Sequence, residues 1–407
     1  MAEPSIEIDV DLDVQEILLA ASQHDIAKLR PLIRSNEKVA DPINVKDPET
    51  GYTPLHAAVA ACEPDEEEKD DSAPNGAEVN GGQGSEHAQL VQSGVETVRF
   101  LLLEGAIWND LDNNNETPGC LARRIGVIEL YEIFVDAGVR AEMLLNRLDE
   151  YEALSDDEEE EEGEEENEED ETAAQEEGDE APELVEGPDV TNNRYLESNL
   201  TFQNDRLLDQ DQNGVMMAWE TEIMAKSAKK LLPTPGLRVL NIGHGMGIVD
   251  GFFQEQAPAA HHIVEAHPEV VAEMKRRGWH EKPGVTIHEG KWQDILPALV
   301  VEGHTFDAIY YDTFAESYAD FRQFFSEEVI GLLEQEGKWG FFNGMGADRQ
   351  ISYDVYQKVA EMEIFEAGFD VEWEEIKVPK LVGEWNGVRR PYWVVDSYRL
   401  PLCKYMD

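Results

Sequence analysis

A loop of alternating glycines, NIGHGMGI (residues 241–248), follows the apolar run LRVL and is the clearest candidate for chemistry in this chain. Because they lack a Cβ, Gly243, Gly245 and Gly247 let the backbone turn tightly and approach a ligand closely. Glu265 follows Gly243 by 22 residues at the end of the next predicted strand, where an acid can accept both hydroxyls of an adenosine ribose. Strand, loop, helix and distal acid together predict a site for an adenosine-containing cofactor.

The spacing of the glycines favours one such cofactor over another. The loop has the pattern G-x-G-x-G and lacks the third glycine of the G-x-G-x-x-G pattern of NAD sites. An acidic cleft that is poor in arginine also suits a sulfonium cation better than a pyrophosphate. We therefore predict S-adenosyl-L-methionine as the cofactor, and an NAD-dependent oxidoreductase remains the rival hypothesis.

Two acids stand in apolar surroundings. Glu220 lies inside VMMAWETEIM (residues 215–224), a stretch with helical spacing, and Asp312 ends the apolar run AIYYD. A buried acid usually needs a partner, which makes both residues candidates for a functional site. Structural alternatives exist for this set: Met216 and Trp219 could be core residues, and an Asp at a strand end could cap a helix.

Composition limits the possible partners. The 407 residues carry a formal charge of −56, and nineteen acids with no Lys or Arg lie between Asp156 and Glu183. Such a chain repels nucleic acid, whose binding needs clustered Lys and Arg, and basic proteins are more natural partners. The three cysteines form no CxxC pair, and no apolar run reaches the length of about 18 residues that spans a membrane. We expect a protein of a reducing compartment, the cytoplasm or the nucleus, with no signal peptide, membrane span or metal site.

The first 150 residues resemble helical repeats. GYTPLHAA (51–58) is close to the T-P-L-H-x-A signature of ankyrin repeats, and Thr117-Pro118 follows the first Thr-Pro pair by 64 residues. That distance exceeds one ankyrin period of about 33 residues, which predicts an acidic insert near residues 63–93. We predict an ankyrin-like repeat domain over residues 1–150 whose surface binds a protein partner. The alternative is a merely structural cap on the second half.

The remaining chain divides into a linker and an α/β domain. Residues 151–188 are too acidic to bury a core, and we predict a disordered linker there. From residue 189 to 407 short apolar runs alternate with helical stretches, which predicts a mostly parallel sheet covered by helices on both faces, with ligands at the carboxyl ends of its strands. The predicted strands are 237–242, 261–266, 285–290, 306–312, 338–343, 371–378 and 392–400.

A set of segments carries a family resemblance. VMMAWETEIM, RVLNIGHGMGIV, IVEAHPEV, EGKWQDI and YYDTFAESY occur in this order and resemble the guanidinoacetate methyltransferases. With the repeats, the acidic linker and RYLESNLTF before them, the whole chain is similar to the fungal type IV arginine methyltransferases, which methylate the δ-nitrogen (N5) of arginine. The resemblance implies a class I methyltransferase fold with a Rossmann-like seven-stranded sheet, S-adenosyl-L-methionine as cofactor and an accessible arginine of a basic protein, of the ribosomal class, as substrate.

The same resemblance implies roles for individual residues. Glu220 and Asp312 would be the catalytic pair that holds the guanidine. The glycine loop would wrap the amino-acid part of the cofactor, and the other residues would surround its ribose and base. The implied cofactor-binding residues are Tyr195, Met216, Met224, Gly243, His244, Gly245, Met246, Gly247, Ile248, Glu265, Ala266, His267, Lys291, Trp292 and Asp312.

Two departures from the resemblance keep alternatives open. Asn241 stands at a strand end where many related methyltransferases have an acid. D-T-F-A at residues 312–315 stands where the small-molecule enzymes tend to have D-T-Y-P, which weakens guanidinoacetate as the substrate. A small-molecule guanidine methyltransferase and a non-catalytic ankyrin adaptor remain alternatives, and the intact Glu220, Glu265 and Asp312 argue against the adaptor.

Overall fold

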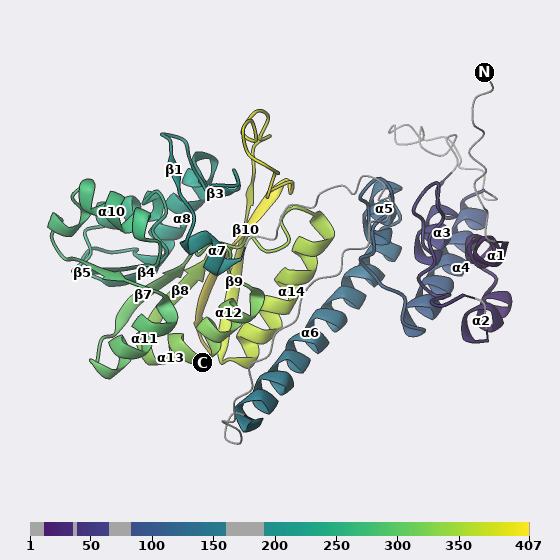
Figure 1. The fold of residues 1–407 in the computed structure, drawn as a ribbon, viewed down its shortest axis with the longest axis horizontal. Helices are drawn as coiled ribbons and strands as arrows, with labels where there is room; N and C mark the ends of the chain where they lie inside the picture. Colours follow the sequence, from purple (N-terminus) through teal and green to yellow (C-terminus); the bar gives the residue numbers. More distant parts are fainter. Residues whose placement is uncertain (1–11, 36–38, 65–82, 160–190, 407) are drawn as a thin grey trace, which may run out of the picture. The chain divides into compact units, whose positions relative to one another are not determined.

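In a computed structural model of the protein, residues 12–35, 39–64, 83–159 and 191–406 are described (Figure 1). The chain forms two compact units. The first comprises residues 1–144 and 349–358, and the second comprises residues 145–348 and 359–407. Within the covered ranges, no helix combines the length and the apolar character needed to cross a lipid bilayer.

The first unit is built from helices, and its two Thr-Pro pairs open two of them. Thr53 and Thr117 each cap a helix whose first residue is proline, and their hydroxyls accept backbone N–H groups. The ring of His56 also bonds to the carbonyl of Glu116 at 3.0 Å, which joins the two turns. These contacts agree with the repeat hypothesis, but an ankyrin architecture stays a prediction. The helices of this region are α1 (Leu12–Ser22), α2 (Ile26–Arg34), α3 (Pro54–Ala60), α4 (Gln83–Leu103), α5 (Pro118–Arg124) and α6 (Ile128–Glu159).

Two segments are helical where the sequence suggested an insert or a linker. Residues 83–93 of the predicted insert form the first half of α4, and residues 151–159 of the predicted linker form the end of α6. Both segments are rich in residues with good helix propensity, such as Glu, Ala and Leu, which lets each helix continue into them. Residues 65–82 and 160–188 of these predictions lie outside the described residues.

The second unit contains a seven-stranded sheet with the order β6-β5-β4-β7-β8-β10-β9 (Figure 1). The first five of these strands run parallel, and β10 is antiparallel to both of its neighbours. The prediction of a mostly parallel sheet is therefore confirmed. The direction of strand progression reverses between β4 and β7, and ligands of open α/β sheets bind at such a point. The strands are β4 (Arg238–Ile242), β5 (Ala260–Glu265), β6 (Val285–Glu289), β7 (Phe306–Tyr311), β8 (Leu333–Phe341), β9 (Phe369–Lys377) and β10 (Ser397–Tyr405).

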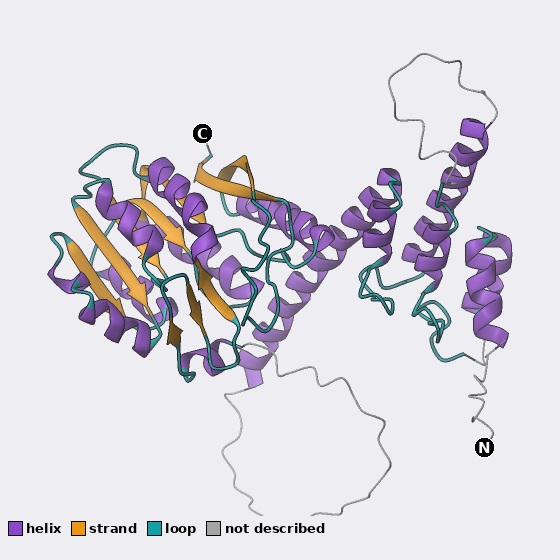
Figure 2. Cartoon of the chain, turned by 90° about the horizontal axis from the view of Figure 1, so that it is seen from above, coloured by secondary structure: helices purple, strands orange, loops and turns teal. Residues whose placement is uncertain are grey.

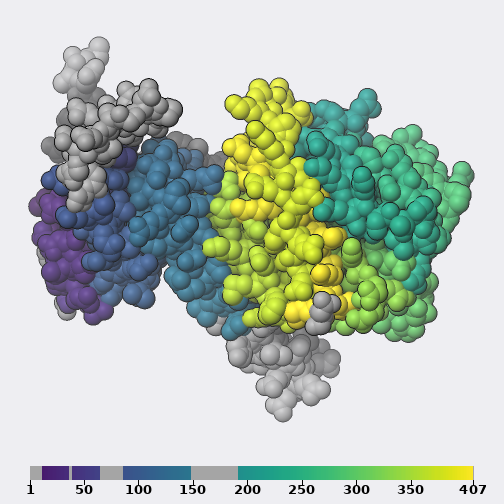
Figure 3. All heavy atoms as spheres, turned by 180° about the vertical axis from the view of Figure 1, so that it is seen from behind, coloured from purple at the N-terminus to yellow at the C-terminus, as the bar shows by residue number. Residues whose placement is uncertain are grey.

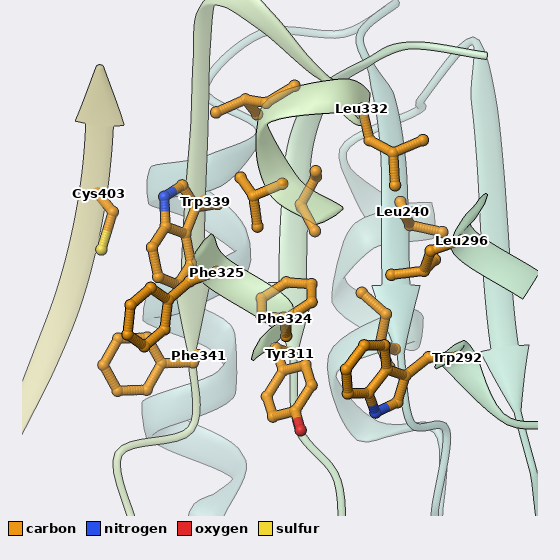
Figure 4. Packing of buried hydrophobic residues seen from close by; sticks show 14 of the residues in the cluster. Leu240, Trp292, Leu296, Tyr311, Phe324, Phe325, Leu332, Trp339, Phe341 and Cys403 are labelled. Carbon is orange, nitrogen blue, oxygen red and sulfur yellow. The ribbon is translucent and has the colours of Figure 1, made fainter. Parts of the chain in front are cut away.

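Helices cover both faces of this sheet (Figure 2). Successive strand residues point to opposite faces, so Leu240 and Ile242 of β4 pack in one core cluster and Val239 packs in the other. Figure 4 shows the first cluster, in which Trp292 and Tyr311 take part. Residues of α8 (Thr221–Leu231), α9 (Ile248–Glu255) and α10 (Pro268–Arg276) pack in the Val239 cluster. Residues of α11 (Trp292–Val301), α12 (Tyr318–Gln323), α13 (Val329–Leu332) and the C-terminal half of α14 (Gln350–Glu366) pack in the Leu240 cluster.

The helical interpretation of residues 215–224 is wrong for the first half of that stretch. Val215 to Met217 belong to a strand, Ala218–Glu220 is a 3-10 turn, and only the residues after it are α-helical. Apolar side chains here satisfy a strand equally well, because Met216 pairs with Leu207 across a small sheet. That sheet contains β1 (Thr201–Phe202), β2 (Arg206–Leu208) and β3 (Gly214–Met217), and the short helix α7 (Asn192–Leu196) precedes it.

The last predicted strand is displaced along the chain. The sequence placed it at residues 392–400, whereas β10 begins at Ser397 and ends at Tyr405. The skipped residues form the end of a loop in which Trp393 donates its indole N–H to the carbonyl of Val395 at 2.7 Å. Their aromatic and β-branched side chains gave a strand-like pattern that a local hydrogen bond overrides.

Candidate active site

A pocket opens at the carboxyl ends of β4, β5, β6 and β7 and holds about 590 Å³ of empty space, including the part open to solvent. Its position at the reversal of strand order is the one expected for a ligand site. The predicted site residues that line it are Tyr195, Met216, Gly243, Gly245, Glu265, Ala266, Lys291, Trp292 and Asp312. Its other lining residues are Asn192, Leu196, Val215, Ile242, Val264, Gly290, Thr313, Phe314 and Glu316.

The three glycines of the loop after β4 adopt positive φ angles and lie close to neighbouring atoms. At Gly243, where φ is +90°, a Cβ would lie 1.9 Å from the carbonyl oxygen of Asp312. At Gly245, where φ is +53°, a Cβ would lie 2.8 Å from the terminal carbon of Met216. Gly247 precedes α9 with a φ of +76°, and a Cβ there would meet the ring of His244 at 2.6 Å. The positive φ angles therefore favour glycine at all three positions, and at Gly243 the contact with backbone also leaves no space for a Cβ.

Glu265 at the end of β5 holds this loop. Its Oε2 atom accepts the main-chain N–H of His244 at 2.8 Å, and its Oε1 atom accepts the N–H of His267 at 2.7 Å. The sequence predicted a role in binding ribose hydroxyls. A carboxylate offers about four acceptor positions, so Glu265 can hold the loop and still face a ligand in the pocket that it lines.

A buried charge network lies behind the loop. Asp250 of α9 is fully buried and bonds to His244 at 2.6 Å, His261 at 2.8 Å and the amide of Asn241 at 2.9 Å. Burial raises the pKa of Asp250, but His244 and His261 outweigh it and hold the pKa at about 2. The same Asn241 amide donates to the carbonyl of Gly243 at 2.8 Å. Asn241 thus ties the loop to a buried acid rather than to the pocket.

Several predicted site residues support the pocket without lining it. The ring of His267 bonds to the carbonyl of Tyr195 at 3.1 Å, and the N–H of Met246 approaches the sulfur of Met216 at 3.2 Å. Met224 is fully buried in the core beneath β4. Among the described residues, His244, Gly247 and Ile248 also lie outside the pocket lining. Direct cofactor contacts by these residues stay predictions.

The two candidate catalytic acids lie within electrostatic reach of one another. Asp312 follows β7, and its Oδ2 atom is buried without a hydrogen-bond partner. Burial, and then the charge of Asp250, raise the pKa of Asp312 to about 7. Glu220 is only 4% exposed, and burial followed by the charge of Asp312 raises its pKa well above the usual value. Asp312 loses its proton first, and its negative charge then makes it harder for Glu220 to ionise.

The structural alternative for Asp312 is wrong. Helix α12 is capped by Ser317, which forms a reciprocal capping box with Asp320. Asp312 therefore caps no helix. A capping hydrogen bond does not offset the cost of placing its carboxylate here.

Three important residues around the site escaped the sequence analysis. Tyr392 donates its hydroxyl proton to Glu220 from 172 residues away, and no local pattern could have revealed this contact. Phe314 packs edge-on against Tyr195 with ring centroids 4.9 Å apart. Glu316 accepts hydrogen bonds from the indole of Trp292 at 2.9 Å and from the Tyr311 hydroxyl. An acid within the aromatic segment YYDTFAESY was a signal for Glu316.

The charge of the pocket lining points to a cationic ligand. Among the described lining residues, Lys291 is the only cation, whereas Glu265, Asp312 and Glu316 are acids. Burial also raises the pKa of Glu316. The described His, Cys, Asp and Glu side chains form no group of three that could hold a metal ion. Such a lining favours a sulfonium or a guanidinium over a pyrophosphate.

Comparisons with known proteins identify the family. Among solved structures, precorrin-6y C5,15-methyltransferase from Geobacter metallireducens GS-15 is 16% identical with a TM-score of 0.33, over 46% of this chain and 87% of that chain. Residues 184–378 match the guanidinoacetate N-methyltransferase family. The chain is 76% identical to protein arginine N-methyltransferase 2 of Aspergillus oryzae and 73% identical to that of Aspergillus fumigatus, over 100% of both chains in each case. The chain therefore belongs to the protein arginine N-methyltransferase 2 family.

Proposed function

We propose that this chain transfers a methyl group from S-adenosyl-L-methionine to the δ-nitrogen (N5) of an arginine in a basic protein of the ribosomal class. Its family is that of S-adenosylmethionine-dependent protein arginine methyltransferases. The seven-stranded α/β domain has the class I methyltransferase fold that the resemblance implied. The choice of nitrogen and the class of substrate protein are what the proposal adds.

The pair Glu220 and Asp312 is the observation that carries the proposal. Glu220 is only 4% exposed, and the Oδ2 atom of Asp312 is buried without a hydrogen-bond partner. Burying two acids close enough to interact electrostatically is costly, and their raised pKa values reflect that cost. A guanidinium would relieve it, because its planar fork of N–H donors matches two carboxylates and its charge neutralises them. The pair therefore suits an arginine side chain.

The pocket fits S-adenosyl-L-methionine. The backbone of Gly243 and Gly245 reaches a position that a Cβ would block, and Glu265 stands at the strand end suited to ribose hydroxyls. Lys291 and Trp292 line the part of the pocket assigned to the base. When bound, the cofactor supplies a methyl group on a cationic sulfur. The acidic lining disfavours the pyrophosphate of NAD, which argues against the oxidoreductase alternative.

In this proposal Glu220 and Asp312 orient the arginine and accept its proton. Removing a proton from guanidinium at pH 7, given a pKa near 13, would cost roughly 8 kcal/mol, so loss of the proton before attack is unfavourable. The proton therefore leaves late, as the new N–C bond forms, and passes to Asp312. The orientation of the guanidinium between the two acids decides which nitrogen receives the methyl group.

We also propose that the first unit binds the protein substrate. The hydrogen bond between His56 and Glu116 connects two Thr-Pro turns in a way that supports stacked helical repeats. Repeat stacks offer extended surfaces for protein partners. The acidic charge of the chain suits a basic partner.

The test is methylation of a dialysed fungal protein extract by the full chain with methyl-labelled S-adenosyl-L-methionine. After acid hydrolysis, mass spectrometry locates the label on the arginine side chain. We expect N5-methylarginine in a small set of basic proteins. Label on a terminal guanidine nitrogen would refute the choice of N5. Label on added guanidinoacetate instead of protein would favour the second candidate, a small-molecule guanidine methyltransferase, which the family match of residues 184–378 supports.

A further inference from the structure

The loop between β9 and β10, residues 378–396, is anchored on the small sheet β1–β3. The guanidinium of Arg206 donates to the carbonyl of Asn386 at 2.8 Å and to that of Glu384 at 3.2 Å. The main-chain N–H of Arg389 donates to the carbonyl of Gln212 at 2.8 Å. Figure 3 shows this C-terminal part of the chain, in yellow, beside the teal surface of the segment that contains the small sheet. The anchored loop carries Tyr392 to Glu220.

A directed chain of hydrogen bonds runs from Trp219 through Tyr392 to Glu220. The indole N–H of Trp219 lies 3.2 Å from the Tyr392 hydroxyl oxygen, which in turn bonds to Oε1 of Glu220. An indole N–H can only donate, so the hydroxyl oxygen accepts it and directs its own proton toward the carboxylate. Glu220 is therefore the acceptor at the end of this chain.

The aromatic ring of Tyr392 is also held in place. Trp385 packs edge-on against it with ring centroids 4.9 Å apart. On another side, a Cβ at Gly214 would lie 2.8 Å from the ring. The glycine thus allows the ring to approach β3, and the packing restricts where the hydroxyl can point.

We propose that Tyr392 is a positioning residue for methyl transfer, whose hydroxyl holds one carboxylate oxygen of Glu220 so that the acid meets the substrate arginine in a single orientation. The inference rests on the proposed role of Glu220 in binding guanidinium. It adds the β9–β10 loop to the substrate site, although this loop contributes nothing to the lining of the cofactor pocket among the described residues.

The groups around Glu220 give this role a pH signature. Asp312 after β7, Tyr310 on β7 and Tyr392 on the loop are the titratable groups that interact with it electrostatically. Burial and the charge of Asp312 raise the pKa of Glu220, whereas the Tyr392 hydroxyl opposes this shift. Without the hydroxyl the pKa would rise further, so the carboxylate would form only at a higher pH.

The experiment compares Tyr392→Phe with the wild type in the full chain. We would measure labelled methyl transfer into the dialysed extract from pH 6 to 9, and binding of S-adenosylhomocysteine by calorimetry. We expect unchanged cofactor-product binding and a loss of transfer of about 10- to 100-fold at pH 7, the range for a lost hydrogen bond to a charged group. The loss should shrink as the pH rises, because the acid limb of the profile moves to higher pH. Tyr405→Phe is the matched control, since that hydroxyl bonds to the carbonyl of Leu333.

Two further results decide the inference. Gly214→Ala should displace the Tyr392 ring and reduce transfer in the same direction. Wild-type rates for Tyr392→Phe at every pH, or a uniform loss without movement of the acid limb, would overturn the positioning role. If the wild type itself transfers no methyl group to arginine, the proposed function fails first, and this inference falls with it.

Discussion

Gly243 and Asp312 approach so closely that a Cβ on the glycine would lie 1.9 Å from the main-chain carbonyl oxygen of the aspartate. The contact joins the loop after β4 to the end of β7, and the N–H of Asp312 also donates to the carbonyl of Ile242 at 2.9 Å. The residue proposed to hold the arginine and the loop proposed to hold the cofactor are therefore parts of one rigid edge. A change that moves the backbone on one side must therefore move the backbone on the other.

Gly243→Ala should weaken cofactor binding for this reason. The added methyl group collides with backbone atoms, and the φ of +90° costs an additional 1–2 kcal/mol or so for a residue with a Cβ. Calorimetry with S-adenosylhomocysteine should show a loss of more than about tenfold in affinity. Gly251→Ala in α9 is the control, because a Cβ at this position would meet no atom within 4 Å. This variant should bind S-adenosylhomocysteine normally. Wild-type affinity in Gly243→Ala would show that the loop does not contact the cofactor.

Asp312→Asn and Glu220→Gln should separate catalysis from cofactor binding. Each change keeps the shape of the side chain but removes a carboxylate that, in the proposal, binds the guanidinium. We expect transfer to fall by about 100-fold or more while the affinity for S-adenosylhomocysteine stays within a few-fold. Glu361→Gln, at an exposed position of α14, serves as the control. Full turnover in either active-site variant would remove that residue from the mechanism.

The raised pKa of Asp312, about 7, predicts an acid limb in the activity profile. The free enzyme must lose the protons of both Glu220 and Asp312 before two carboxylates can bind guanidinium, so kcat/KM should fall about tenfold per pH unit below the higher pKa of Glu220, and up to about a hundredfold per pH unit below the pKa of Asp312. The stability of the folded protein should change with pH in the opposite direction to activity. Folding raises the pKa from 3.8, so this group favours the folded state most at low pH, and that contribution is lost as the pH rises toward 7. Thermal unfolding of Asp312→Asn should lack that decline, and parallel curves for the two proteins would contradict the assignment.

Asp250→Asn should change the pKa of Asp312, although Asp250 does not line the pocket. The charge of Asp250 contributes to the raised pKa of Asp312, so its removal should move the acid limb to lower pH. Asp250 itself has a lowered pKa, and its contribution to stability is present above pH 3.8 and lost as the pH falls toward 2. At pH 7 we expect the variant to lose about 3 kcal/mol of stability, as when one partner of a buried ion pair is removed. Glu255→Gln, exposed on the same helix, should change neither quantity.

The sequence contained enough local information to locate the strand that leads into the glycine loop. Residues 237–242 were predicted as a strand and β4 spans Arg238–Ile242, because a short apolar run ending in glycines has few other conformations available. The same kind of pattern misled at residues 215–224 and 392–400. There the apolar and aromatic spacing suited more than one structure, and hydrogen bonds that the pattern does not show decided between them: Ala218 donates to the carbonyl of Asp205, and Trp393 donates to that of Val395.

The sequence could predict several residues of the candidate site, but not the hydrogen bonds that join them to other segments. Asp312 and Glu265 could be located because each ends a strand, and strand ends gather at one edge of a parallel sheet. The second role of Glu265, holding the N–H groups of His244 and His267, depends on the conformation of the loop. The pairing of Asn241 with Asp250 depends in the same way on how α9 packs, and the sequence showed only that an acid was missing at that position.

By itself the sequence determined the α/β class of the second unit, the glycine loop and the strand-end acids, because these depend on spacing over a few residues. Only the tertiary structure decided that Glu220 receives its hydrogen bond from Tyr392, and that Asp312 remains without a partner for one buried oxygen. Burial and pairing of a charge are set by segments far apart in the chain, and their energies appear only when folding removes water from around them.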